Sequence, residues 1–204
     1  MRASKREILW GVALVALAIL SYEFLNHSGR HRLLELTTDF DRAMPLVPAF
    51  VVPYLSFIPL VFVVVPWLSL RSGLVFKTFT VSMFVSQMIL NVLYLLVPAT
   101  VVRPEITSND IFSILLRDLV WKLDEPLNTF PSNHVTFSVL AIFALAKLKL
   151  QTRWLLPMQI WFGLICVSTL LVYQHVLLDL VSGVTIGALV FLIVWNVFNR
   201  SSNN

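Results

Sequence analysis

Six stretches of about 20 mostly apolar residues divide this chain of 204 residues, and they constrain its fold more than any other feature. A helix needs about 20 apolar residues to cross the hydrocarbon core of a bilayer. The composition agrees, because 58% of the residues are hydrophobic and 13% are charged, against about 45–50% and about 25% in soluble domains. We therefore expect an all-α integral membrane protein, a single domain over 1–204, with six transmembrane helices at roughly 8–26, 47–70, 74–98, 131–149, 154–173 and 175–198.

The first apolar run follows Arg2, Lys5 and Arg6, which is also how a signal peptide begins. The run is long, however, and residues 26–30 after it make a poor cleavage site. We interpret it as a retained membrane anchor.

The distribution of basic residues predicts the orientation, because cytoplasmic loops contain an excess of Lys and Arg. One set of helix ends has a single acid, Glu7, among the basic residues Arg2, Lys5, Arg6, Arg71, Lys77, Lys147, Lys149, Arg153 and Arg200. The opposite set mixes six basic residues with eight acids. We expect a multi-pass protein of the inner (cytoplasmic) membrane, with both termini in the cytoplasm and the loops 27–46 and 99–130 on the extracytoplasmic side.

Charge and cysteine usage exclude several classes of function. The basic residues are scattered, so the net charge of +4 does not indicate a nucleic-acid partner. The single cysteine, Cys166, excludes an intrachain disulfide and a cysteine-based metal cluster. No obligatory protein partner is evident.

Both extracytoplasmic loops contain an amphipathic segment, at 31–43 and at 109–123. Such segments can lie in the membrane interface as short helices and cover a site that opens to lipid and water. Solvated loops with apolar patches are the alternative interpretation.

His175 and Asp179 stand four residues apart at the start of the last apolar run. This spacing brings both side chains to one face of a helix. A carboxylate that binds one imidazole nitrogen fixes the tautomer and leaves the other nitrogen free as a nucleophile. A buried hydrogen-bonded pair that joins two helices would produce the same pattern.

A second histidine, His134, stands at the start of the fourth run, after Pro131, Ser132 and Asn133. Pro131 suits the first turn of a helix, and the free N–H groups of a helix start bind anions. His134 could then protonate a leaving alkoxide. An interfacial capping cluster is the alternative.

Arg103, followed by Pro104, comes after the third run. Its guanidinium suits bidentate binding of a phosphate. An anchor for lipid headgroups is the alternative.

Together these residues resemble the type 2 phosphatidic acid phosphatase (PAP2) superfamily, over roughly residues 45–195. Its three motifs are Lys-x6-Arg-Pro, Pro-Ser-Gly-His and Ser-Arg-x5-His-x3-Asp. Arg103-Pro104 matches the end of the first motif, 131–134 match the second with Asn for Gly, and 168–179 match the third with Thr for Arg. The sequence around these motifs is similar to a divergent branch of the superfamily that includes bacterial membrane lipid phosphatases and inositol phosphorylceramide synthases. The resemblance implies a PAP2/chloroperoxidase-like helical bundle with short interfacial helices.

The resemblance also implies a role for each motif residue. His175 would attack phosphorus, Asp179 would support it, and His134 would act as general acid. Arg103 and Ser132 would bind the phosphate, with the Asn133 backbone helping. No metal and no cofactor are implied.

Two cations of the family pattern are missing, since Leu96 replaces the usual Lys and Thr169 the usual Arg. Phosphoryl transfer depends on electrostatic stabilisation, so other groups should replace these cations. Our candidates are Arg117, Lys122 and, as a neutral donor, Gln174. Asp124 and Asn128 are expected to shape the substrate pocket, or else to be loop turn residues.

The leading hypothesis is therefore a metal-independent membrane lipid phosphatase that works through a phospho-histidine at the extracytoplasmic face. Its substrate and partner would be a phosphorylated lipid, with phosphatidic acid, phosphatidylglycerol phosphate and isoprenyl diphosphate as candidates. A phosphotransferase to a lipid or sugar hydroxyl is the first alternative. A non-catalytic membrane scaffold or transporter is the second.

Overall fold

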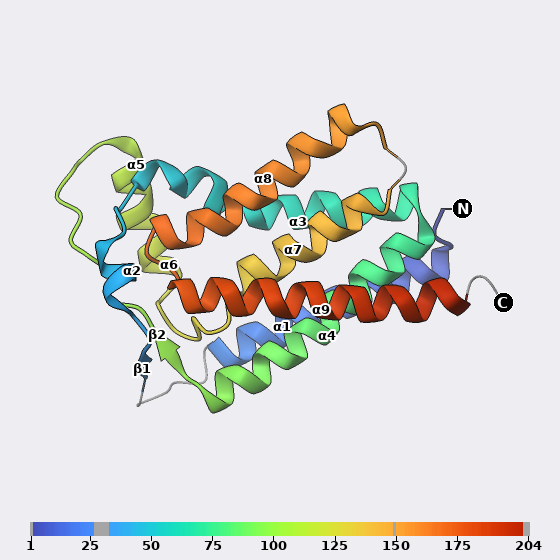
Figure 1. Cartoon of the computed structure of the whole chain (residues 1–204), viewed down its shortest axis with the longest axis horizontal. Helices are drawn as coiled ribbons and strands as arrows, with labels where there is room; N and C mark the ends of the chain where they lie inside the picture. The colour runs from blue at the N-terminus through green and yellow to red at the C-terminus, as the bar shows by residue number, and fades with distance from the viewer. Residues whose placement is uncertain (1, 27–32, 149, 202–204) are drawn as a thin grey trace.

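The structure, a computed structural model, describes residues 2–26, 33–148 and 150–201, and most of them are helical. The long helices are α1 (Lys5–Asn26), α3 (Val51–Arg71), α4 (Gly73–Leu96), α7 (Asn133–Ala146), α8 (Thr152–Leu171) and α9 (Leu177–Ser201). They run along one long axis, and the start of α1 and the end of α9 lie at the same end of the bundle (Figure 1). The prediction of a helical membrane protein is confirmed.

The short elements gather at the opposite end of the bundle (Figure 1). They are β1 (Leu34–Glu35), α2 (Asp39–Ala43), a 3₁₀ turn (Pro48–Phe50), β2 (Ala99–Thr100), α5 (Ile111–Ile114), a π-helical turn (Leu115–Val120) and α6 (Trp121–Leu123). The expected interfacial segment 109–123 is thus helical from Ile111 onward.

The helix expected over 31–43 is wrong within its described part, 33–43. Leu34 and Glu35 instead form β1, which pairs in parallel with β2, and the Leu34 N–H donates to the Pro98 carbonyl at 2.7 Å. Only the last five residues are helical, and Thr38 begins that helix with a capping box to Asp41. The strand contact between distant segments therefore outweighs the local helical periodicity.

Five described helices are long and apolar enough to cross a membrane: α1, Pro48–Arg71, α4, α8 and α9. The fourth expected span, 131–149, is shorter, because α7 has 14 residues and a length of about 21 Å, against a hydrocarbon core of about 30 Å. Nine residues of α7 are buried, and it packs against α4, α8 and α9. A helix surrounded by protein need not match the bilayer thickness. The structure thus has one helix of spanning length fewer than the sequence predicts.

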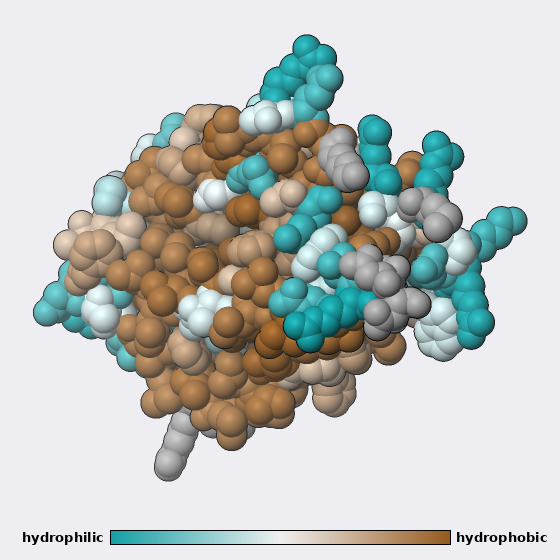
Figure 2. All heavy atoms as spheres, turned by 45° about the vertical axis from the view of Figure 1, so that its right-hand side comes forward, coloured by the Kyte–Doolittle hydropathy of each residue, from teal (hydrophilic) through white to brown (hydrophobic). Residues whose placement is uncertain are grey.

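The outer surface of the bundle is apolar along most of its length. Figure 2 shows hydrophobic residues over most of one face, with hydrophilic residues gathered toward the end that holds the chain termini. Large apolar side chains on several helices are exposed, among them Leu20, Phe62 and Ile193. Such a surface is stable against lipid chains rather than water, which supports an integral membrane protein.

Helices α7 and α9 approach each other most closely at two glycines of α9. A Cβ atom on Gly183 would lie 2.9 Å from the Ser132 carbonyl oxygen, and one on Gly187 would lie 2.7 Å from the Thr136 carbonyl oxygen. The Thr136 hydroxyl also donates across the contact to the Gly183 carbonyl at 3.3 Å. Small residues four apart allow this kind of backbone approach between membrane helices. The contact fixes the start of α7 beside the start of α9.

The segment 33–46 also holds the start of α9. The buried Asp41 carboxylate accepts a hydrogen bond from the Leu177 N–H at 2.7 Å. Burial raises the pKa of Asp41, but hydrogen bonds from Thr38 and Leu177 outweigh it and hold the pKa below its ordinary value. The Tyr173 hydroxyl donates to the Met44 carbonyl at 2.6 Å. The turn before α9 is therefore fixed from outside the bundle as well.

We predict that Gly187→Ala destabilises the protein, because the new Cβ atom meets backbone that cannot move without separating α7 from α9. The expected cost is about 1–3 kcal/mol, as for other overpacked sites, although alanine is the better helix former. Thermal unfolding in detergent measures it.

The matched control for this change is Gly163→Ala in α8, where a Cβ atom meets nothing within 4 Å. This variant should be as stable as the unmodified protein or slightly more stable. Equal melting temperatures for the two variants would contradict the close α7–α9 contact.

Candidate active site

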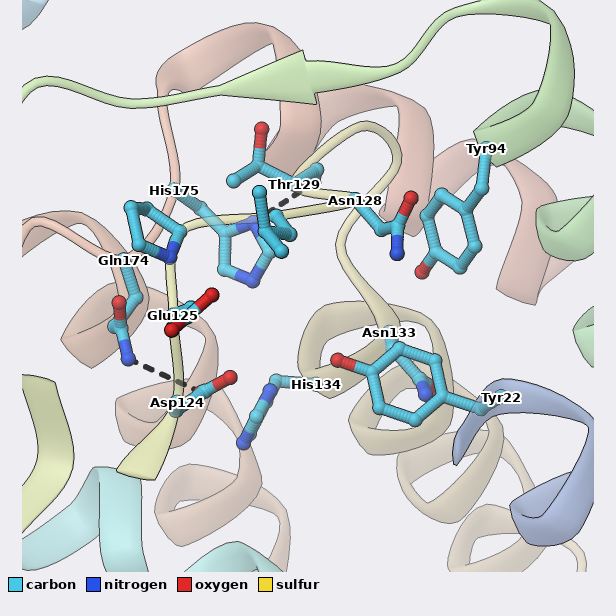
Figure 3. Close-up of a pocket in the computed structure, with 12 residues that line it drawn as sticks. Tyr22, Tyr94, Asp124, Glu125, Asn128, Thr129, Asn133, His134, Gln174 and His175 are labelled. Atoms are coloured by element: carbon cyan, nitrogen blue, oxygen red, sulfur yellow. Dashed lines mark hydrogen bonds between the residues drawn. The ribbon is translucent and has the colours of Figure 1, made fainter. Parts of the chain in front are cut away.

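A small cavity lies at the end of the bundle where the short elements gather, between the starts of α7 and α9. Its volume is about 20 Å³, which is space for one or two water molecules. Two catalytic candidates, His134 and His175, line it together with Gln174 and Asn133 (Figure 3). Residues from α1, α4 and the segment 124–129 complete the lining. The fold thus joins residues that lie more than 40 positions apart.

His175 is held by its Nδ1 atom. Nδ1 lies 2.9 Å from the Thr129 carbonyl oxygen and 3.3 Å from Asp179 Oδ2. A carbonyl oxygen can only accept, so the proton of the neutral ring is on Nδ1 and the lone pair is on Nε2. The ring turns its other nitrogen into the cavity (Figure 3). This is the orientation and the tautomer that a nucleophilic imidazole needs.

Asp179 is fully buried, and one of its carboxylate oxygens contacts two neighbouring groups. Its Oδ2 accepts a hydrogen bond from the Val176 N–H at 3.0 Å and lies within reach of the His175 ring. The first contact satisfies a free N–H at the start of α9, and the second orients the histidine. Asp179 Oδ1 has no hydrogen-bond partner among the described residues. The carboxylate therefore combines a structural role with a position suited to stabilise a cationic His175.

His134 lies across the cavity from His175, with 6.3 Å between the ring centroids. It stacks on Tyr54 at 4.5 Å and contacts Phe57 at 4.4 Å. These two α3 side chains fix the plane of the imidazole. The two histidine rings therefore face the same small cavity.

The start of α7 brings free N–H groups to the cavity. Ser132 is the N-cap, its hydroxyl accepting from the Val135 N–H at 3.3 Å, and its own N–H donates to the Asp179 carbonyl. Ser132 is fully buried and does not line the cavity, and Pro131 precedes the helix instead of forming its first turn. The N–H groups of Asn133 and His134 have no partner among the described residues. The helix start thus retains two donors and its positive end for an anion.

Arg103 does not line the cavity but stands directly behind it. Its guanidinium donates to the carbonyls of Trp121 (2.9 Å) and Asp124 (2.6 Å) and to the side-chain oxygen of Gln174. Burial lowers the pKa of Arg103, and the nearby Asp124 carboxylate opposes that effect. Each of its terminal nitrogens therefore already has a protein acceptor.

A chain of hydrogen bonds continues from Arg103 to the cavity wall. Gln174 accepts from Arg103 and donates to Asp124 Oδ2 at 3.0 Å, and Asp124 also accepts from the Tyr54 hydroxyl at 2.6 Å. Tyr54 is the residue that stacks on His134. Arg103 and Gln174 are therefore connected to the histidine through its aromatic neighbour.

The two cations proposed as replacements lie elsewhere. Lys122 pairs with Asp118 at 2.8 Å and is largely exposed, and Arg117 pairs with the same carboxylate at 3.0 Å. The hydrogen bond from Lys122, and to a lesser extent the one from Arg117, holds the pKa of Asp118 below its ordinary value. Neither lines the cavity. The two positions where the family pattern has cations hold uncharged residues here. Leu96 is exposed on α4, and Thr169 is fully buried.

Sequence reasoning missed several residues at this site. Thr129 acts through its carbonyl, which leaves no mark in the choice of side chain, and Glu125 lines the cavity from the same segment. Tyr22 and Tyr94 enter from α1 and α4 (Figure 3). Asp124 and Asn128 do line the cavity, and Asn128 has a positive φ of 53°, which Asn tolerates better than most residues. Among the described lining residues there are two carboxylates and no Lys or Arg.

No three described His, Cys, Asp or Glu side chains converge in a way that could hold a metal ion.

The family model of the PAP2 superfamily matches residues 75–203, which is more than half of the chain and includes all the motif residues discussed above. The chain belongs to the PAP2 superfamily. Neither the curated proteins nor the solved structures contain a match.

We predict that Arg103→Met destabilises the segment 121–124, because the change leaves three acceptors without their donor. Each buried acceptor left unpaired costs about 1–3 kcal/mol, so the melting temperature in detergent should fall by roughly 4 °C or more. Arg117→Met is the control, since its partners lie at the surface and its loss should change stability by about 0.5 kcal/mol or less. Equal losses in both variants would show that Arg103 holds nothing in place.

Proposed function

We propose that this protein is a membrane lipid phosphatase that acts through a phospho-histidine on His175. The observation that carries the proposal is the pairing of His175, with Nε2 unprotonated toward the cavity, and His134 across from it. Membership of the PAP2 superfamily supports the same chemistry. The site would need neither a metal nor a cofactor.

The reaction would proceed in two balanced steps. His175 Nε2 attacks phosphorus while the bond from phosphorus to the lipid oxygen breaks, and His134 gives its proton to the leaving alkoxide. Asp179 stabilises the cationic phospho-imidazole through Nδ1. Water then attacks the phosphorus, His134 takes a proton from it, and the bond to Nε2 breaks to release phosphate. A positioned acid of this kind contributes about 10²–10⁴ in rate.

The phosphate oxygens would bind at the start of α7. The N–H groups of Asn133 and His134 are the donors without partners there, and a helix N-terminus is equivalent to about half a positive charge. This arrangement would partly replace the two cations that the family motifs contain and this chain lacks. Arg103 would act as a positioning residue through Gln174, and as a phosphate ligand only if the loop 121–124 moved.

Substrate binding requires the lining side chains to move apart, because a phosphate group exceeds a cavity of about 20 Å³. The segment 124–130 has no regular secondary structure, which makes it the element best able to move. By the positive-inside rule this end of the bundle faces the extracytoplasmic side of the inner membrane. The substrate would be a phosphorylated lipid of the phosphatidic acid, phosphatidylglycerol phosphate or isoprenyl diphosphate class.

A phosphotransferase is the second candidate, and the two carboxylates at the cavity would suit it as well as they suit a hydrolase. Asp124 and Glu125 line the cavity beside the histidines, and a carboxylate accepts a hydrogen bond from an attacking hydroxyl as readily as from water. The phosphoryl or phospho-headgroup would then pass to a lipid or sugar alcohol.

We predict that the purified protein, in detergent with EDTA, releases phosphate from at least one of phosphatidic acid, phosphatidylglycerol phosphate and undecaprenyl diphosphate. His175→Gln should lower the rate by at least about a thousandfold, since it removes the nucleophile. Thr185→Ala, which removes an exposed hydroxyl from the same helix, should keep full activity.

Diacylglycerol and ceramide serve as acceptors in a parallel assay with a headgroup donor. Product formation there, without release of free phosphate, identifies the transferase. No product in either assay would overturn both enzymatic proposals, and full activity of His175→Gln would overturn the assignment of the nucleophile.

A further inference from the structure

A second, much larger hollow lies at the other end of the bundle, between α3 and α8. Its volume is about 560 Å³, which is within the range of ligand pockets. Its walls are mostly apolar and include Val63 and Met158, while Trp67, Arg71, Arg153 and Trp154 also line it. In Figure 1, α3 and α8 diverge toward this end. We call this hollow the α3–α8 groove.

The groove contains two arginines without an acidic partner among the described residues. The Arg71 guanidinium lies 5.3 Å from the Trp67 ring, and that of Arg153 lies 5.7 Å from the Trp154 ring. Neither arginine forms an ion pair or a hydrogen bond with another described residue. Contact with a ring orients a guanidinium through its face and leaves its N–H edges free for an acceptor.

The position of the groove in the membrane limits what can occupy it. Arg71 ends a helix of spanning length and Arg153 begins another, so both lie where the hydrocarbon core meets the headgroups. Apolar walls below two cations match a molecule with hydrocarbon chains and a negative head. The candidate active site opens at the opposite end, so the occupant of the groove is not in position to be hydrolysed.

We propose that the α3–α8 groove binds one anionic phospholipid from the leaflet opposite the candidate active site. The lipid phosphate would lie between Arg71 and Arg153, and the acyl chains would cover the apolar walls. Basic pockets between membrane helices bind anionic headgroups in this way. This site is independent of the proposed function and would not depend on His175 or His134.

Native mass spectrometry of the detergent-solubilised protein, with equal amounts of phosphatidylglycerol and phosphatidylcholine, tests the proposal. The unmodified protein should retain phosphatidylglycerol in preference. The variant Arg71→Gln/Arg153→Gln should bind phosphatidylglycerol roughly 30-fold more weakly, from about 1 kcal/mol per basic residue. The control Lys77→Gln/Lys147→Gln removes the same charge outside the groove, where the lysines lie over Phe198 and Trp195, and should keep the preference.

A second measurement needs no variant. Phosphatidylglycerol with a photoreactive acyl chain should crosslink the unmodified protein within 63–71 and 150–158. Equal binding of the two lipids by the unmodified protein, equal loss of preference in both double variants, or crosslinks confined to other segments would each overturn the proposal.

Discussion

The close contact between α7 and α9 is the constraint on which the rest of the structure depends. It is possible because Gly183 and Gly187 have no side chain where the α7 backbone passes. The same contact lets the Ser132 N–H donate to the Asp179 carbonyl, so the two helix starts are joined at the level of the cavity. The histidine after Asn133 and the histidine before α9 therefore face one space. Every chemical role inferred for them follows from that placement.

Electrostatics at the cavity differ from what a phosphate site usually provides. Its described lining contains Asp124 and Glu125 but no cation, and Arg103 uses its terminal nitrogens to hold Trp121, Asp124 and Gln174. The positive end of α7 is then the main source of attraction for an anion. Under the proposed function, such a weak source suits a substrate that would bind largely through its lipid chains, because burial of apolar surface would supply the remaining affinity.

Much of the fold could be predicted from local sequence, since apolar runs of about 20 residues and the spacing of His175 and Asp179 are local features, although His175 lies just before α9 and not within it. The strand at Leu34 and the short buried α7 depend on distant neighbours, so local patterns miss them. The ion pairs of Arg117 and Lys122 are local, because their shared partner Asp118 is one and four residues away. The Thr129 carbonyl leaves no signal in any side chain. The two glycines of α9 did leave one, because small residues four apart in an apolar helix indicate close helix packing.

The most direct test of this account is the position of phosphorus on the enzyme during turnover. The reaction with a labelled lipid phosphate is quenched without acid, so that a phospho-histidine survives. Peptide mass spectrometry then identifies the phosphorylated residue, and ³¹P NMR distinguishes its two ring nitrogens. The hydrogen bond from His175 Nδ1 to the Thr129 carbonyl predicts phosphorus on Nε2 of His175 and its absence in His175→Gln. Phosphorus on Nδ1, or on His134, in an active enzyme would contradict the account.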